Sequence, residues 1–155
     1  MTLDDASVTQ ALFHPRPETH GYSPAGIPTT TRVAGAEIAG YLHENSKSDA
    51  LLLFFHGNGE ISADYDSIIS IYTDCGVSCW IIDYRGYGRS TGAPRFSWML
   101  EDAEAVLSDV ARLGKIVGHE YKQVIVMGRS LGLSLIHISE PTRLLSISYA
   151  VFCLK

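Results

Sequence analysis

Three short, largely apolar runs, each leading into a turn that contains glycine or a cluster of polar residues, constrain this chain most strongly. A strand that is covered on both faces is apolar along its whole length, whereas a half-exposed strand alternates apolar with polar residues. Stretches with helical spacing lie between the runs, so the order is strand, helix, strand, helix, strand. This order predicts an α/β fold with a parallel sheet and right-handed crossovers. The three predicted strands are Leu51 to Phe55, Val77 to Ile82 and Val124 to Met127.

Two helices are predicted between these strands. The first runs from Ile61 to Gly76, and the second has Ser97 as its N-cap and ends near Gly114 and Gly118. Each carries one apolar stripe at helical spacing, which indicates that one face packs on the sheet. The stripe residues are Tyr65, Ile68, Ile69 and Tyr72 in the first helix and Trp98, Met99, Ala103, Val106, Leu107, Val110 and Leu113 in the second.

A different pattern precedes the first apolar run. Residues 1–26 contain several prolines and no sustained periodicity, which predicts an irregular lead-in. Residues 27–33 and 37–43 are rich in β-branched residues and tyrosine, and a small turn at 34–36 separates them. We therefore expect a β-hairpin ahead of the parallel strands.

Composition excludes several classes of protein. The 155 residues are 46% hydrophobic, with 12 basic and 17 acidic side chains and a formal net charge of −5. No apolar run approaches the roughly 18 residues of a membrane span, and the scattered basic residues do not predict a nucleic-acid partner. The cysteines Cys75, Cys79 and Cys153 lack the further ligands of a zinc site. With no secretory signature, they indicate a reducing, cytoplasmic setting, and no metal or cofactor is predicted.

The third apolar run leads directly into Gly128-Arg129-Ser130-Leu131-Gly132. This G-x-S-x-G spacing after a buried strand is typical of a nucleophile elbow, in which a serine occupies a tight strand-to-helix turn. Such a turn imposes strained backbone angles on the serine and leaves room only for glycine two residues to either side. The pattern predicts that Ser130 stands clear at the carboxyl end of the sheet, where ligands bind in open α/β folds.

A dinucleotide site is excluded by spacing. Gly86 and Gly88 follow a predicted strand, but Gly92 lies one residue too far along for G-x-G-x-x-G. Pro94 also separates these glycines from the next helix, so no helix N-terminus would face a pyrophosphate.

Three motifs together resemble the α/β-hydrolases, and within them the branch with serine aminopeptidase-like, lysophospholipase-like and acyl-protein depalmitoylase-like members. The resemblance covers roughly residues 11–132, including a His-Pro-Arg-Pro lead-in at 14–17. The motifs are FFHGNG at 54–59, DYRGYGRSTG at 83–92 and VMGRSLG at 126–132. The fold implied is the N-terminal part of an α/β-hydrolase, with an incomplete sheet.

The resemblance implies a role for each motif. Ser130 is the implied nucleophile, and the backbone N–H groups of Asn58 and Leu131 are the implied oxyanion-hole donors. Residues 83–92 would shape the site beside them. Without the resemblance, Gly57 and Gly59 could simply form a tight turn between a strand and a helix.

A serine hydrolase also needs a histidine and a carboxylate, which in this fold follow the serine in the order acid, then histidine. After Gly132 the only candidates are His137 and Glu140, which stand in the reverse order. His137 would lie about 10 Å along the helix axis from Ser130, so we reject it as the general base.

The end of the chain resembles translated DNA of a different origin. Residues 133–143 match the translation of a transposase adapter used in short-read library preparation, and residues 147–154 match the outer adapter that follows it. We therefore expect residues 1–132 to be the N-terminal portion of an α/β-hydrolase domain and 133–155 to be a non-native tail. Ending the native sequence there would leave Val124 to Met127 at an open sheet edge with an uncovered apolar face.

These observations predict a parent protein that is a cytoplasmic serine hydrolase. It would cleave ester, thioester or peptide bonds in a small-molecule, acyl or peptidyl substrate through an acyl-enzyme, without cofactor or metal. The alternative is a non-catalytic α/β-hydrolase-like protein with a binding or structural role. The chain itself, without the catalytic acid and histidine, is expected to be inactive and prone to aggregate.

Overall fold

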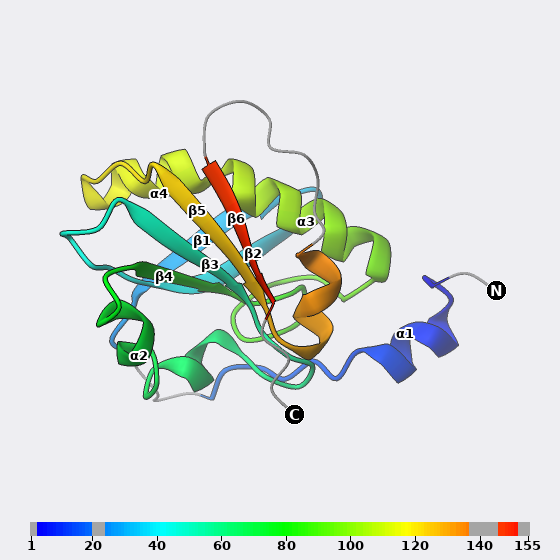
Figure 1. Cartoon of the computed structure of the whole chain (residues 1–155). Helices are drawn as coiled ribbons and strands as arrows, with labels where there is room; N and C mark the ends of the chain where they lie inside the picture. Colours follow the sequence, from blue (N-terminus) through cyan, green and yellow to red (C-terminus); the bar gives the residue numbers. More distant parts are fainter. Residues whose placement is uncertain (1–2, 20–23, 137–145, 152–155) are drawn as a thin grey trace.

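A computed structural model describes residues 3–19, 24–136 and 146–151 of the chain. Its core is one mixed sheet of six strands in the order β1-β2-β4-β3-β5-β6 (Figure 1). In chain order the elements are α1 (Ala6–Leu12), β1 (Ile27–Val33), β2 (Ala36–His43), β3 (Ala50–Phe55), η1 (Ser62–Tyr65), α2 (Ser70–Thr73), β4 (Ser78–Ile82), α3 (Phe96–Ser108), α4 (Val110–Val117), β5 (Gln123–Gly128), η2 (Ser130–Leu135) and β6 (Ser146–Val151).

The strand directions confirm the predicted hairpin and parallel core. β1 pairs with β2 in antiparallel fashion, and β2 pairs with β4 the same way. β4, β3, β5 and β6 then run parallel to one another. The sheet is open, and its architecture is that of an α/β-hydrolase fold in part, as expected.

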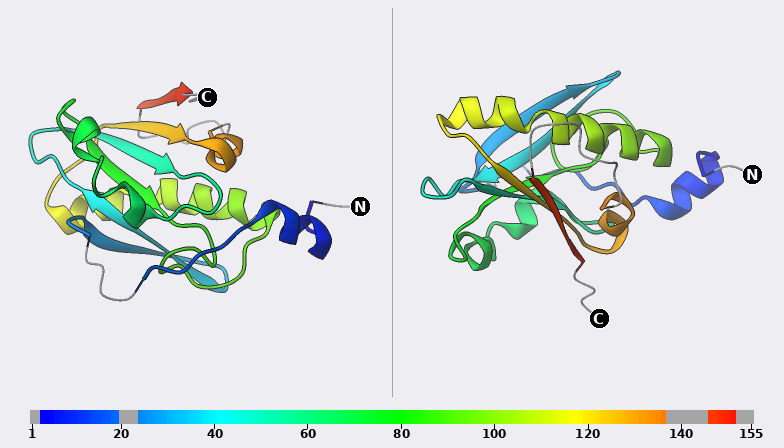
Figure 2. Two further views of the ribbon diagram at one scale, coloured as in Figure 1. Left: turned by 90° about the horizontal axis from the view of Figure 1, so that it is seen from below. Right: turned by 45° about the horizontal axis from the view of Figure 1, so that its top comes forward.

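Helices cover both faces of the sheet, which explains why the strands are apolar throughout (Figure 2). Alternate residues of each strand point to opposite faces. One face packs with α3 and α4 through Leu51, Leu53, Phe55, Trp80, Ile82, Val124 and Val126. The other packs with Tyr65 and Ile69 from the η1–α2 region through Leu52, Phe54, Cys79, Ile81 and Met127.

The helices differ from the sequence prediction in three places. The lead-in contains α1, which no periodicity signalled because none of its residues is buried. The first predicted helix is broken into η1 and α2. The second is broken at Asp109, whose φ of −85° and ψ of −4° depart from helical values. The Asp109 carboxylate instead accepts hydrogen bonds from Thr31 Oγ1 at 2.6 Å and from Arg112.

Ser97 is not the N-cap of α3, which begins one residue earlier with Arg95 at the cap position. The backbone N–H of Ser97 donates to Asp4 Oδ1 at 3.1 Å, so a carboxylate from the lead-in satisfies this free N–H group. Hydrogen bonds from the side chain and the backbone of Ser97 lower the pKa of Asp4. A partner distant in sequence has replaced the local cap.

The expectation of an open edge at β5 is wrong in this structure. β6 pairs with β5 along its whole length, from Gln123↔Ser146 to Gly128↔Val151. Val126 and Met127 are also buried. The unpaired N–H and C=O groups of an edge strand attract any extended segment, and the β-branched residues of 146–151 favour that conformation. No helix of the described residues is both long and apolar enough to cross a membrane.

Candidate active site

Ser130 lies at the turn between β5 and η2 with a φ of +52°. It is the one residue other than glycine with a positive φ among the residues that the structure describes. Ser130 is exposed and follows the carboxyl end of the parallel strand β5. The backbone therefore has the strained geometry that the G-x-S-x-G pattern predicts for an elbow.

Gly128 and Gly132 have no room for a side chain. A Cβ on Gly128 would collide with the backbone carbonyl of Gly132, and one on Gly132 would collide with that of Phe55. Both glycines have ordinary φ values, so steric space and not backbone freedom requires them. Any larger residue at either position would force the neighbouring backbone to move.

The loop that carries Asn58 lies beside the elbow because β3 and β5 end at the same level. Phe55 is the register partner of Gly128, and the backbone N–H of Arg129 donates to the Phe55 carbonyl at 3.0 Å. The segment with Asn58, which follows β3, and the segment with Leu131, which follows β5, therefore begin next to each other at the same edge of the sheet. Within the described part of the chain, neither backbone N–H is tied up in a hydrogen bond.

The side chain of Asn58 anchors this loop to the lead-in. Its Nδ2 donates to the Leu12 carbonyl at 2.7 Å and lies 2.8 Å from His14 Nδ1. Its Oδ1 accepts from the His14 backbone N–H at 2.9 Å and from the Tyr87 hydroxyl at 2.7 Å. Tyr87 belongs to the 83–92 loop, which therefore does lie beside the site. Sequence patterns gave no signal for this network.

The match to known families decides the identity of the fold. The family described as serine aminopeptidase, S33, matches residues 46–139 of the chain. The chain belongs to this family. The matched segment includes β3, the Asn58 loop, the 83–92 loop and the Ser130 elbow, and it extends past Gly132. Leu135 and Ile136, which follow the elbow, are buried against the core.

Relatives of this S33 family member are distant and longer. YfhR of Salmonella typhimurium, an uncharacterized protein, is 25% identical over 130 residues, which are 79% of this chain and 43% of YfhR. An uncharacterized membrane protein of Saccharomyces cerevisiae is 36% identical over 90 residues, 58% of this chain and 30% of that protein. The chain thus spans less than half the length of these curated relatives.

Solved structures show the same fold. A predicted CIB-like hydrolase from Thermoplasma acidophilum has a TM-score of 0.52 at 21% identity, over 74% of this chain and 55% of that chain. An esterase from Pyrococcus furiosus has a TM-score of 0.60 at 17% identity, over 81% and 51% of the two chains. These likenesses establish the α/β-hydrolase fold for the S33 family chain.

His56 and Asp83 form a pair next to the site that looks catalytic but is buried. His56 Nε2 lies 3.2 Å from Asp83 Oδ1, and both side chains are fully enclosed. The contact is close enough for an ion pair, yet it is not aligned as a hydrogen bond. His56 Nδ1 contacts the Gly57 carbonyl at 2.8 Å, and the Asp83 carboxylate accepts two hydrogen bonds from Ser62. The pair joins the ends of β3 and β4, and its hydrogen bonds in the described residues go to Gly57 and Ser62 and not to Ser130.

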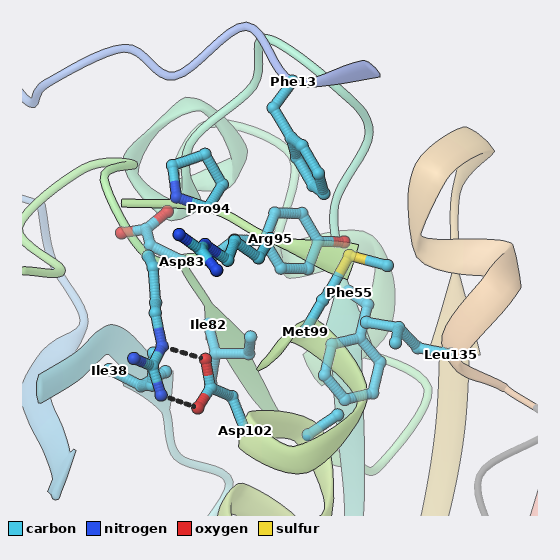
Figure 3. Close-up of a pocket in the computed structure, with 13 residues that line it drawn as sticks. Phe13, Ile38, Phe55, Ile82, Asp83, Pro94, Arg95, Met99, Asp102 and Leu135 are labelled. Carbon is cyan, nitrogen blue, oxygen red and sulfur yellow. Dashed lines mark hydrogen bonds and ion pairs between the residues drawn. The ribbon is translucent and has the colours of Figure 1, made fainter. Parts of the chain in front are cut away.

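A small pocket lies between the sheet and α3 (Figure 3). Phe55, Met99 and Leu135 line it, together with the ion pair of Arg85 and Asp102. Ser130, Asn58 and Leu131 are not among its lining residues. We therefore interpret it as a gap in the packing beneath the site.

Metal ligands are not assembled in the part of the chain that the structure describes. No three His, Cys, Asp or Glu side chains gather there in a way that could hold an ion. Cys75 is exposed and Cys79 is buried, and burial raises the pKa of Cys79 to about 12. His137 and Glu140, considered above for the catalytic base and acid, and Cys153 lie outside the described residues.

Proposed function

We propose that residues 1–132 are the N-terminal portion of a longer serine hydrolase, which is called the parent protein below. The observation that carries the proposal is the exposed Ser130 at a φ of +52°, flanked by two glycines that admit no side chain. Strain at a non-glycine residue persists only where the surrounding structure enforces it, and such positions cluster at active sites. Membership of the S33 family supports hydrolysis as the reaction.

The proposed reaction proceeds through an acyl-enzyme. Ser130 Oγ attacks the carbonyl carbon of an ester, thioester or amide while its proton passes to a histidine, and the carbonyl oxygen becomes an oxyanion. The backbone N–H groups of Asn58 and Leu131 stabilise that charge. The leaving group takes the proton from the histidine and departs. Water then attacks the acyl group by the same route and restores Ser130.

The histidine and the acid of this mechanism are proposed to lie in sequence of the parent protein beyond Gly132. Among the described residues, His14, His43, His56 and His119 make no hydrogen bond to Ser130. Without a general base the serine hydroxyl is a weak nucleophile. We therefore expect this chain by itself to be inactive.

The test uses the parent protein, recovered by sequencing through the region that encodes residues 133–155. Purified protein should hydrolyse p-nitrophenyl esters and should be labelled by a fluorophosphonate, and Ser130→Ala should abolish both. A folded parent protein that neither hydrolyses such esters nor takes up the label would favour the non-catalytic alternative. Hydrolysis that survives Ser130→Ala would reject Ser130 as the nucleophile.

A further inference from the structure

Glu60 connects the two loops that flank Ser130. Its Oε2 accepts a hydrogen bond at 2.6 Å from the backbone N–H of Gly57, the residue immediately before Asn58. Its Oε1 forms an ion pair with Arg129, the residue immediately before Ser130. One carboxylate thus holds the Asn58 loop on one side and the elbow on the other.

The surroundings of Glu60 fix the carboxylate in place. The Tyr65 hydroxyl donates to Oε2 at 2.6 Å, and burial raises the pKa of Tyr65, which keeps the hydroxyl protonated as a donor. Gly57 lies directly beneath the ion pair: a Cβ there would be 2.8 Å from Glu60 Oε2 and 3.0 Å from Arg129 Nη1. Three donors from three segments therefore converge on one acidic group.

Main-chain hydrogen bonds between the Asn58 loop and the elbow are few among the described residues. At the strand ends, the backbone N–H of Arg129 in the elbow donates to the carbonyl of Phe55, the last residue of β3. Within the part of the chain that the structure describes, no main-chain hydrogen bond joins residues 57–60 to residues 129–132. An oxyanion hole requires its two donors to stay at a fixed separation, since a shift of about 1 Å can lower the rate about 100-fold.

We propose that Glu60 and Arg129 form a clamp that sets the separation of the Asn58 and Leu131 N–H groups. This inference rests on the proposed function, because it assigns positioning residues to the same site. Neither side chain needs to touch the substrate. Their effect should therefore fall on the transition state, whose oxyanion the two N–H groups bind, and not on binding of the uncharged substrate.

The test compares Glu60→Gln and Arg129→Gln with wild-type parent protein. We expect kcat for a p-nitrophenyl ester to fall about 10- to 100-fold, with KM within about twofold. The affinity for a boronic acid, whose tetrahedral adduct with Ser130 places an oxygen in the oxyanion hole, should fall by the same factor. Arg129→Lys, which keeps the charge, should recover part of the loss.

Arg112→Gln is the matched control. Arg112 pairs with Asp109, and the two side chains are 48% and 16% exposed, close to the 49% and 25% of Arg129 and Glu60. Arg112 lies on α4 and Asp109 at the junction of α3 and α4, and Arg112 also donates to the Thr30 carbonyl of β1. Neither residue contacts the Asn58 loop or the elbow through a hydrogen bond of the described residues, so loss of this pair should leave kcat and boronic acid affinity unchanged. Unchanged kcat and boronic acid affinity in both clamp variants would overturn the proposal, as would equal losses in Arg112→Gln.

Hydrogen exchange tests the proposed role of Glu60 and Arg129 separately from the proposed serine hydrolase function. In the clamp variants, amides of residues 56–60 and 129–132 should exchange at least about tenfold faster, while those of β3 and β5 stay protected. This readout does not require catalysis. If Ser130→Ala leaves hydrolysis intact, the proposed function fails, and unchanged exchange in both segments would separately overturn the clamp. Arg129→Gln serves the same purpose should Glu60→Gln not fold.

Discussion

Ser130 combines two properties that normally exclude each other, a β-carbon and a left-handed backbone. Its φ of +52° is one that glycine adopts freely and that costs other residues about 1–2 kcal/mol. The crowding of Gly128 and Gly132 shows why the turn cannot relax: the backbone of η2 packs against the ends of β3 and β5. The local sequence thus encodes the strain, and the sheet enforces it.

This strain predicts an inverted stability order at position 130. In the parent protein, Ser130→Gly should be more stable than Ser130→Ala by about 1 kcal/mol, because only glycine relieves the left-handed strain. Urea unfolding of both variants measures the difference. At the exposed helical residue Glu104, the same pair of substitutions should show the ordinary order, with alanine more stable by about 1 kcal/mol. An alanine variant as stable as the glycine variant at position 130 would contradict the strain.

At the scale of elements, the strands follow from sequence more directly than the helices. The strands β3, β4 and β5 are covered on both faces, so an apolar run marks each of them in the sequence. The hairpin follows from its turn and its β-branched residues. The ends of α3 depend on distant groups. Asp4 supplies the acceptor for Ser97, and Thr31 draws Asp109 out of a continuous helix. Neither contact has a local signal.

The loop between β4 and α3 depends on a buried ion pair. Arg85 donates to the two carboxylate oxygens of Asp102, each at 2.7 Å (dashed lines in Figure 3). The Arg85 guanidinium also lies 4.4 Å from the centre of the Trp98 ring. The same loop carries Tyr87, which contacts Asn58. The ion pair therefore helps to hold the 83–92 loop, and with it Tyr87, against Asn58.

Removing one partner of this pair should be costly. In the parent protein, Asp102→Leu should lower the free energy of unfolding by about 3–5 kcal/mol, because Arg85 is left charged and buried. Combining it with Arg85→Met should recover most of that loss. Lys122→Met, which breaks an exposed pair with Asp49, is the control and should change stability by less than about 0.5 kcal/mol. A single Asp102→Leu change that costs as little as the control would show that the pair is not supporting the loop.

At the scale of the whole molecule, β6 moves the unpaired, aggregation-prone edge of the sheet from β5 to itself. It covers β5, but it becomes the outer strand of the sheet itself. Its six residues, SISYAV, carry no charge and no proline, which is the composition of an aggregation-prone edge. We propose that residues 133–155 are a non-native tail. The pairing of residues 146–151 with β5 shows only that an extended segment fits there.

We predict that the chain of 155 residues associates in solution and lacks esterase activity. Light scattering on a size-exclusion column should detect species larger than a monomer, and Ser148→Lys should reduce their amount, since a charge on an edge strand opposes pairing. The parent protein, in which native strands replace the tail, should elute without them. A soluble monomer of this chain that hydrolyses a p-nitrophenyl ester in a Ser130-dependent manner would contradict the prediction.

The sequence alone determined the order of the first five strands along the chain, the turn at Ser130 and the steric reason for glycine near it. These features are local: apolar runs, turn residues and close spacing record them directly. Only the tertiary structure decided which side chains hold the site together. Glu60 with Arg129, and Asn58 with Tyr87 and His14, meet because β3 and β5 end at the same level and the lead-in crosses their loops. Contacts between distant segments depend on strand order and register, which no short stretch of sequence encodes.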